Sequence, residues 1–146
     1  APGDHVLASF SARREEVYAE VYAVEGGGRT VESGGWSVED GGSLAGPEAV
    51  PLAELGEWLP EVDGTMWIAG DGAEAVLQAL DALHDKRRTT HYKPSPALPT
   101  ATAVGILGRE VFSTRGPADV ASFEPFYLKE FVAKKPKRTI FDRLPF

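Results

Sequence analysis

A strict two-residue alternation over residues 15–25 constrains the fold of this chain more than any other feature. One face of this segment collects Val17, Ala19, Val21 and Ala23, and the other carries Tyr18, Glu20, Tyr22 and Val24. This period predicts a β-strand with one buried face. Residues 5–12 are mostly apolar and predict a buried strand, and only Arg13 and Arg14 connect the two segments. We therefore expect a β-hairpin at the start of the chain.

The remaining segments predict an α/β fold with a mixed sheet. In chain order we expect a third strand at 29–40 broken at Gly34-Gly35, a loop at 41–47, a helix at 51–59, a strand at 65–69, a helix at 73–84, a loop at 85–97, a long helix at 99–114 and an extended segment at 123–131. Pro60 stops the first helix and Gly116 ends the last. Because Gly105 and Gly108 weaken the long helix, we expect another backbone to approach them closely. Antiparallel strands followed by strand–helix units are typical of a small α/β domain.

Charge is distributed very unevenly along the chain, whose net charge is −7 over 146 residues. Residues 1–85 hold 17 acidic and 3 basic side chains, whereas residues 86–146 hold 5 acidic and 12 basic ones. Either internal charge complementarity or a solvated acidic surface would explain this asymmetry. The lack of cysteine excludes disulfides and thiolate metal sites, and the three histidines have no zinc-type spacing, so we expect no metal and no cofactor. No run of residues is apolar and long enough for a membrane span.

Three segments resemble the TsaB/YeaZ family. Residues 5–25 are similar to a family segment that reads strand, Asp-Ala-Arg-x-x-Glu-Val-Tyr, strand, with Arg13, Glu16 and Tyr18 matching and Ser11 at the Asp position. Residues 66–72 form a strand that enters a Gly-x-Gly turn. The third segment, Glu124, Pro125, Phe126, Tyr127, Leu128 and Lys129, resembles the near-terminal Glu-Pro-x-Tyr-Leu-Arg of the family, with Lys in place of Arg.

The resemblance implies that residues 1–131 are the C-terminal lobe of a ribonuclease-H-like, actin-like ATPase architecture, followed by a basic and apolar tail at 132–146. It implies a non-catalytic scaffold in a tRNA threonylcarbamoyladenosine-modification complex, working in the cytoplasm. The implied partners are a catalytic, ATP-binding TsaD-like paralogue and a TsaE-like ATPase, with tRNA met only indirectly and a homodimer as an open alternative. The only methionine is Met66, and the first lobe of the family has no counterpart here, so we expect the chain to be part of a longer or processed protein.

Two other functions stay open at this stage. Gly70, Asp71 and Gly72 lie between a strand and a helix, where backbone N–H groups can bind a phosphate, which would fit a nucleotide-dependent transferase or a glycoprotease-like enzyme lobe. Against this, the Asp71 carboxylate occupies the phosphate position and can cap the helix itself. The basic tail would alternatively fit an RNA-binding accessory module.

Structural roles are expected for most of the remaining candidate residues. Arg13 and Glu16 would form an ion pair at the end of the hairpin. Of Phe126 and Tyr127, one should be buried, and we expect Tyr127 to fix the terminal segment to the sheet. The tail mixes five basic residues with Ile140, Phe141, Leu144 and Phe146. A tail that only confers solubility needs no such apolar side chains, so we expect it to dock on a protein surface, either its own domain or a second copy.

Overall fold

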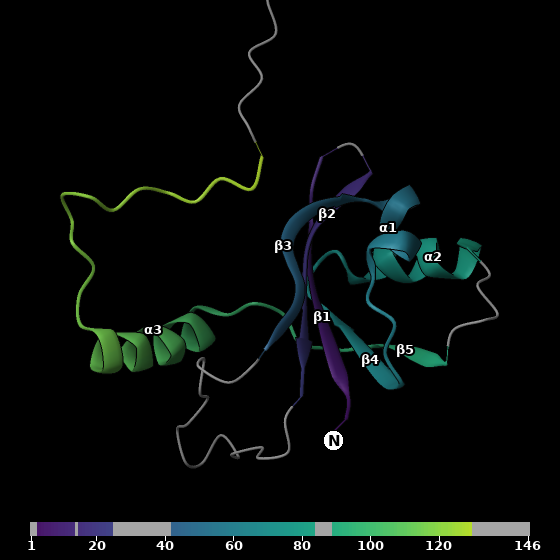
Figure 1. Cartoon of the computed structure of the whole chain (residues 1–146), viewed down its shortest axis with the longest axis horizontal. Helices are drawn as coiled ribbons and strands as arrows, with labels where there is room; N and C mark the ends of the chain where they lie inside the picture. Colours follow the sequence, from purple (N-terminus) through teal and green to yellow (C-terminus); the bar gives the residue numbers. More distant parts are fainter. Residues whose placement is uncertain (1–2, 14, 25–41, 84–88, 130–146) are drawn as a thin grey trace, which may run out of the picture.

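A mixed five-stranded β-sheet forms the centre of the molecule (Figure 1). The computed structural model describes residues 3–13, 15–24, 42–83 and 89–129. The strands are β1 (His5–Ser11), β2 (Glu16–Ala23), β3 (Ser43–Pro51), β4 (Gly64–Ala69) and β5 (Thr90–Pro94), in the spatial order β3-β2-β1-β4-β5. β1, β4 and β5 are parallel, whereas β2 pairs antiparallel with both β1 and β3. The α/β fold with a mixed sheet is therefore confirmed.

The predicted hairpin is present with the expected alternation. β1 and β2 pair from His5↔Ala23 to Ser11↔Val17 without interruption. Val17, Ala19 and Val21 are buried on one face, while the residues between them are half-buried on the other. Because the side-chain period of a strand is two, this register sends every apolar side chain of β2 to the same side.

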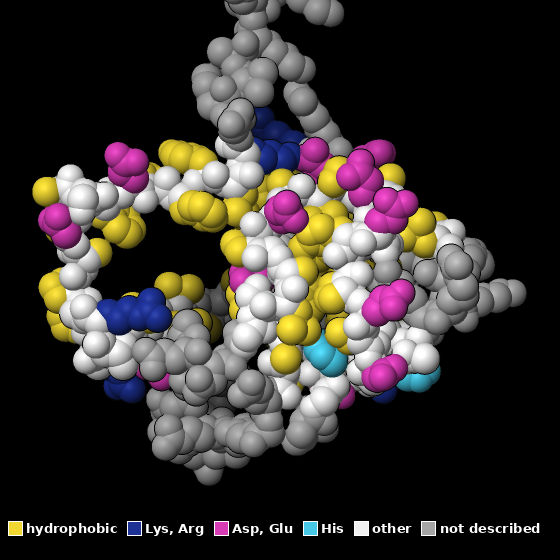
Figure 2. All heavy atoms as spheres, in the orientation of Figure 1, with side chains coloured by type: hydrophobic (Ala, Val, Ile, Leu, Met, Phe, Trp, Pro, Cys, Tyr) yellow, Lys and Arg dark blue, Asp and Glu magenta, His cyan; other side chains and the backbone are white. Residues whose placement is uncertain are grey.

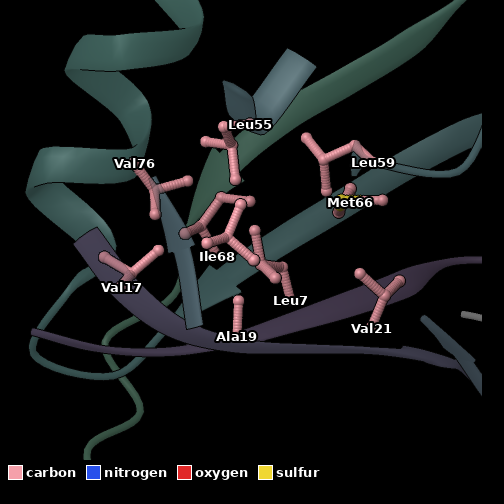
Figure 3. Close-up of a cluster of buried hydrophobic side chains, with 10 residues drawn as sticks. Leu7, Val17, Ala19, Val21, Leu55, Leu59, Met66, Ile68 and Val76 are labelled. Atoms are coloured by element: carbon pink, nitrogen blue, oxygen red, sulfur yellow. The ribbon is translucent and has the colours of Figure 1, made fainter. Parts of the chain in front are cut away.

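Helices cover that same face of the sheet. They are the short 3-10 helix η2 (Leu52–Glu54), α1 (Leu55–Trp58) and α2 (Ala73–Leu83), and both α1 and α2 agree with the predicted positions. Figure 3 shows how Leu55 of α1 and Val76 of α2 point toward Ile68 and Leu7 of the sheet. The buried core consists of Leu7, Val17, Ala19, Val21, Val50, Leu55, Leu59, Met66, Ile68 and Val76.

The predictions of loops at 41–47 and 85–97 were wrong, because the first range contains the start of one edge strand and the second contains the whole of the other. β3 begins at Ser43, and Gly46 lies so close to β2 that a Cβ there would meet the Ala19 carbonyl oxygen at 2.4 Å. β5 lies at the opposite edge of the sheet and pairs with β4. Both strands are largely exposed and contain proline, so their sequences lack the alternation that marks a half-buried strand. The third strand predicted at 29–40 lies outside the described residues.

The long helix is present as α3 (Ala101–Arg115), but it buries none of its residues. The Thr100 hydroxyl accepts a hydrogen bond from the Ala103 N–H and starts the helix, and Gly116 ends it at a φ of 75°. In Figure 1 the helix lies apart from the sheet, away from α1 and α2. The expected close approach to Gly105 and Gly108 was wrong, since a Cβ at either position would meet nothing within 4 Å.

Candidate functional site

The Gly70–Gly72 turn packs tightly against the carboxyl end of β1. Gly70 has a φ of +99°, and a Cβ there would lie 2.0 Å from the Ser9 carbonyl oxygen. The Gly72 N–H donates to that same Ser9 oxygen at 3.1 Å, and the Gly70 N–H donates to the Ala97 oxygen at 3.1 Å. Both glycine N–H groups are therefore engaged by protein carbonyls, and the close approach itself explains why glycine stands at position 70.

Asp71 connects the same turn to the last residue of β1. Its carboxylate accepts a hydrogen bond from the Ser11 backbone N–H at 3.0 Å, and the Ser11 hydroxyl donates to the Asp71 carbonyl oxygen at 3.3 Å. Beneath them, the fully buried Ser9 hydroxyl donates to the Ala69 carbonyl oxygen at 3.0 Å. These three contacts hold β1, β4 and the turn together, so Ser11 and Asp71 form a structural latch.

The described histidines lie near the opposite ends of the strands from this latch. His5 is the first residue of β1 and pairs with Met66, and His91 pairs with Thr65 near the start of β4. Ser11 lies six positions after His5 along β1, which amounts to about 20 Å. A Ser/His/Asp arrangement, in which hydrogen bonds join the three groups, is not formed by these residues. Within the described ranges, no group of three or more His, Cys, Asp or Glu residues could hold a metal ion.

The first and third segments of the family resemblance meet in space at Lys129. Its ammonium group forms an ion pair with Glu16 and lies 5.9 Å from the centre of the Tyr18 ring, within cation–π range. The ion pair expected between Arg13 and Glu16 is thus made by Lys129 instead, and Arg13 is exposed. The sequence identified Lys129 as the replacement for Arg in the terminal motif and not as the partner of Glu16. The available signal was that Lys129 and Glu16 are oppositely charged residues of the same family resemblance.

The other residues of the terminal motif do not pack on the domain. Tyr127 and Phe126 are 79% and 81% exposed, and Glu124 and Pro125 are exposed too, while Leu128 is half-buried. The prediction that Tyr127 is a core anchor was wrong. Residues 123–127 form neither helix nor strand, so no regular pairing presses one face of the segment against the sheet.

The face of the sheet opposite α1 and α2 is the second notable surface, and we call it the open face. The strand register places on it Val6, Ala8, Phe10, Glu16, Tyr18, Glu20, Tyr22, Trp67 and Lys93. Trp67 donates through Nε1 to an Asp4 carboxylate oxygen at 3.1 Å, and the Lys93 ammonium lies 5.6 Å from its ring. Burial raises the pKa of the Tyr22 phenol, and the nearby Glu20 carboxylate raises it further. Figure 2 shows an opening between the sheet and the chain that follows β5.

Comparison with known proteins adds no family to this description: no protein-family model matches the chain, and no curated protein matches it. The fold itself defines an α/β protein with a five-stranded mixed sheet. Across the described part of the chain, no helix is both long and apolar enough to cross a membrane.

Proposed function

We propose that this chain is the non-catalytic C-terminal lobe of a TsaB/YeaZ-type subunit. The observation that carries the proposal is the contact of Lys129 with Glu16 and Tyr18. The resemblance depends on two motifs more than 100 residues apart, and residues from both meet at one point of the fold. Two motifs that matched the family by chance would have no reason to lie side by side in the fold. Their contact therefore supports the resemblance of both segments to the TsaB/YeaZ family.

The sheet supports the finer fold assignment that we make with this proposal. A meander of three strands is followed by two helix–strand units, and β2 alone runs against the other four strands. This arrangement is the one expected of a ribonuclease-H-like lobe. The two helix–strand connections place α1 and α2 on one face, as right-handed crossovers moving in the same direction do.

The hydrogen bonds of the Gly70–Gly72 turn favour a scaffold over a catalyst. A phosphate-binding turn presents free N–H groups, whereas the N–H groups of Gly70 and Gly72 already donate to carbonyl oxygens. Ser11 and Asp71 bind each other, so neither is held by a general base that could activate it for attack. The lobe would then act by completing the subunit that pairs with a catalytic TsaD-like paralogue. A TsaE-like ATPase would join the pair in the cytoplasm, and tRNA would be met through the complex.

Reconstitution of the modification reaction tests this proposal. The protein that carries this lobe is mixed with the TsaD-like and TsaE-like proteins of the same organism, tRNA, ATP and an activated threonylcarbamoyl donor, and threonylcarbamoyladenosine in the tRNA is measured by mass spectrometry. We expect the modified nucleoside to appear only when all components are present. We also expect that the lobe alone hydrolyses neither ATP nor glycoproteins. Hydrolysis by the purified lobe that disappears in Asp71→Ala or Ser11→Ala would instead establish an enzyme lobe.

Charge reversal at the motif contact provides a matched control. Glu16→Lys and Lys129→Glu each place two like charges together, whereas the double variant restores an opposite pair. If the contact stabilises the lobe used in assembly, each single variant should weaken co-purification with the TsaD-like protein, and the double variant should recover part of it. If the original protein, both single variants and the double variant co-purify equally, the contact between Lys129 and Glu16 does not contribute to assembly, and it no longer supports the proposal.

A further inference from the structure

The open face presents an aromatic surface that the described structure leaves without a covering layer. Phe10, Tyr18, Tyr22 and Trp67 lie on it, and Phe10 is 43% exposed. Sheets with parallel strands normally bury both faces, because the strands are apolar on both sides. α1 and α2 cover the other face, and α3 buries no residue against this one. We therefore expect another segment of the chain or another molecule to cover the open face.

The chain itself reaches this face at Lys129. The ion pair with Glu16 and the ring contact with Tyr18 both involve open-face residues of β2. Seventeen residues follow Lys129, from 130 to 146. Extended, they would reach about 55 Å, more than the roughly 20 Å across five strands. Chain length thus permits the segment to cross the whole open face from its attachment at β2.

The composition of residues 130–146 matches the open face in both charge and apolarity. Its basic residues are Lys134, Lys135, Lys137, Arg138 and Arg143, and its large apolar ones are Phe131, Val132, Ile140, Phe141, Leu144 and Phe146. The open face offers the Glu20 carboxylate beside its aromatic rings, while Glu16 is already paired with Lys129 and Lys93 lies by Trp67. The helix α3 is a poorer match in charge, because Arg109 and Glu110 carry opposite signs on adjacent positions.

We propose that residues 130–146 dock on the open face of their own sheet. The basic residues at 134–138 would lie against Glu20, and the apolar residues at 140–146 would cover the aromatic rings toward Trp67. Opposite charges would guide the segment to the face, and burial of the apolar side chains would hold it there. This contact goes beyond the proposed scaffold function and does not depend on it.

Two tryptophans on opposite faces of the sheet allow a direct test. Trp67 lies on the open face, whereas Trp58 lies in α1 and donates to Glu48 at 2.6 Å. The full chain is compared with a chain that ends at residue 131 and with the full-length double variant Ile140→Asp/Phe141→Asp. Indole N–H resonances of ¹⁵N-labelled protein, assigned with Trp→Phe variants, report on each face. Thr139→Asp is the matched control, since it adds charge without removing an apolar side chain.

Docking predicts that both altered chains shift the Trp67 resonance and leave the Trp58 resonance in place. The melting temperature should fall by about 3 °C or more, while Thr139→Asp should lower it less. An unchanged Trp67 resonance with an unchanged melting temperature would overturn the proposal. A Trp67 shift that follows dilution and dissociation of a dimer in sedimentation experiments would assign the face to a second copy instead. Weaker, less salt-dependent tRNA binding after truncation, with Trp67 unmoved, would make the segment an RNA contact and equally overturn the proposal.

Discussion

Substitution of Gly70 by alanine should destabilise the fold severely, although it adds a single methyl group. The new Cβ would lie 2.0 Å from the Ser9 carbonyl oxygen and 3.0 Å from the Ser9 carbonyl carbon, both of which are backbone atoms of a central strand. A φ of +99° is also unfavourable for an L-residue, by about 1–2 kcal/mol. Relief of the clash must move the turn away from β1.

That movement would break the hydrogen bond from the Gly72 N–H to the Ser9 oxygen. Gly72 is buried, so its N–H would lose its partner away from water at a cost of about 1–3 kcal/mol. Together these effects predict a loss of about 2–5 kcal/mol in the free energy of unfolding. Since a domain of this kind is stable by only about 5–15 kcal/mol, the loss should be plain in urea denaturation followed by circular dichroism.

Substitutions of two other glycines provide comparisons for the free energy of unfolding of Gly70→Ala. Gly72→Ala should cost less than Gly70→Ala, because its Cβ would lie 3.2 Å from its nearest neighbours. Gly105→Ala in α3 meets nothing within 4 Å and should increase helix stability by up to about 1 kcal/mol. A Gly70→Ala protein whose unfolding free energy stays within about 1 kcal/mol of the original would refute the steric reasoning. Lost ATP binding at unchanged stability would favour a phosphate-binding turn.

Three other substitutions test separate parts of the description. Tyr127→Ala should change the unfolding free energy by less than about 0.5 kcal/mol, because Tyr127 is 79% exposed; a loss of several kcal/mol would show that it is buried. Lys129→Gln, which removes the ion pair with Glu16, should cost at most about 1 kcal/mol, with the difference reduced in 1 M salt as measured by thermal melts. Because the Tyr22 pKa is raised, this phenol should favour folding below about pH 10 and lose that contribution above it; Tyr22→Phe should flatten the alkaline decline in denaturant melts, and an identical decline would contradict the shift.

Local patterns were enough to predict the centre of the fold and its helices. The alternation in β2 sends Val17, Ala19 and Val21 to one side whatever the strand pairs with, so it indicated both the strand and its buried face. Apolar spacing likewise predicted α1, α2 and α3, with Pro60 and Gly116 marking the ends of the first and last of these helices. These signals act within a few residues of the chain, which is why they can be detected without knowledge of the tertiary structure.

The candidate site was predicted only in part. The Gly70–Gly72 turn was identified between a strand and a helix, but the carbonyl partners of its N–H groups come from Ser9 and Ala97. The latch between Ser11 and Asp71 joins residues 60 positions apart, and no spacing along the chain distinguishes such a pair from two solvated side chains. A Gly-x-Gly turn whose glycine N–H groups are free to bind phosphate has the same sequence pattern as one whose glycine N–H groups already donate to carbonyl oxygens.

The sequence by itself determined that β1, β2, β4 and the three α-helices form, which face of β2 is buried and where charge accumulates, since each depends on neighbouring side chains. Only the tertiary structure decided that β3 and β5 are strands, because an exposed edge strand is defined by the backbone it pairs with. It likewise decided that Glu16 pairs with Lys129 instead of Arg13 and that Tyr127 is exposed. Whether a polar or aromatic side chain is buried depends on what the rest of the chain brings against it, and that is a property of the packed molecule.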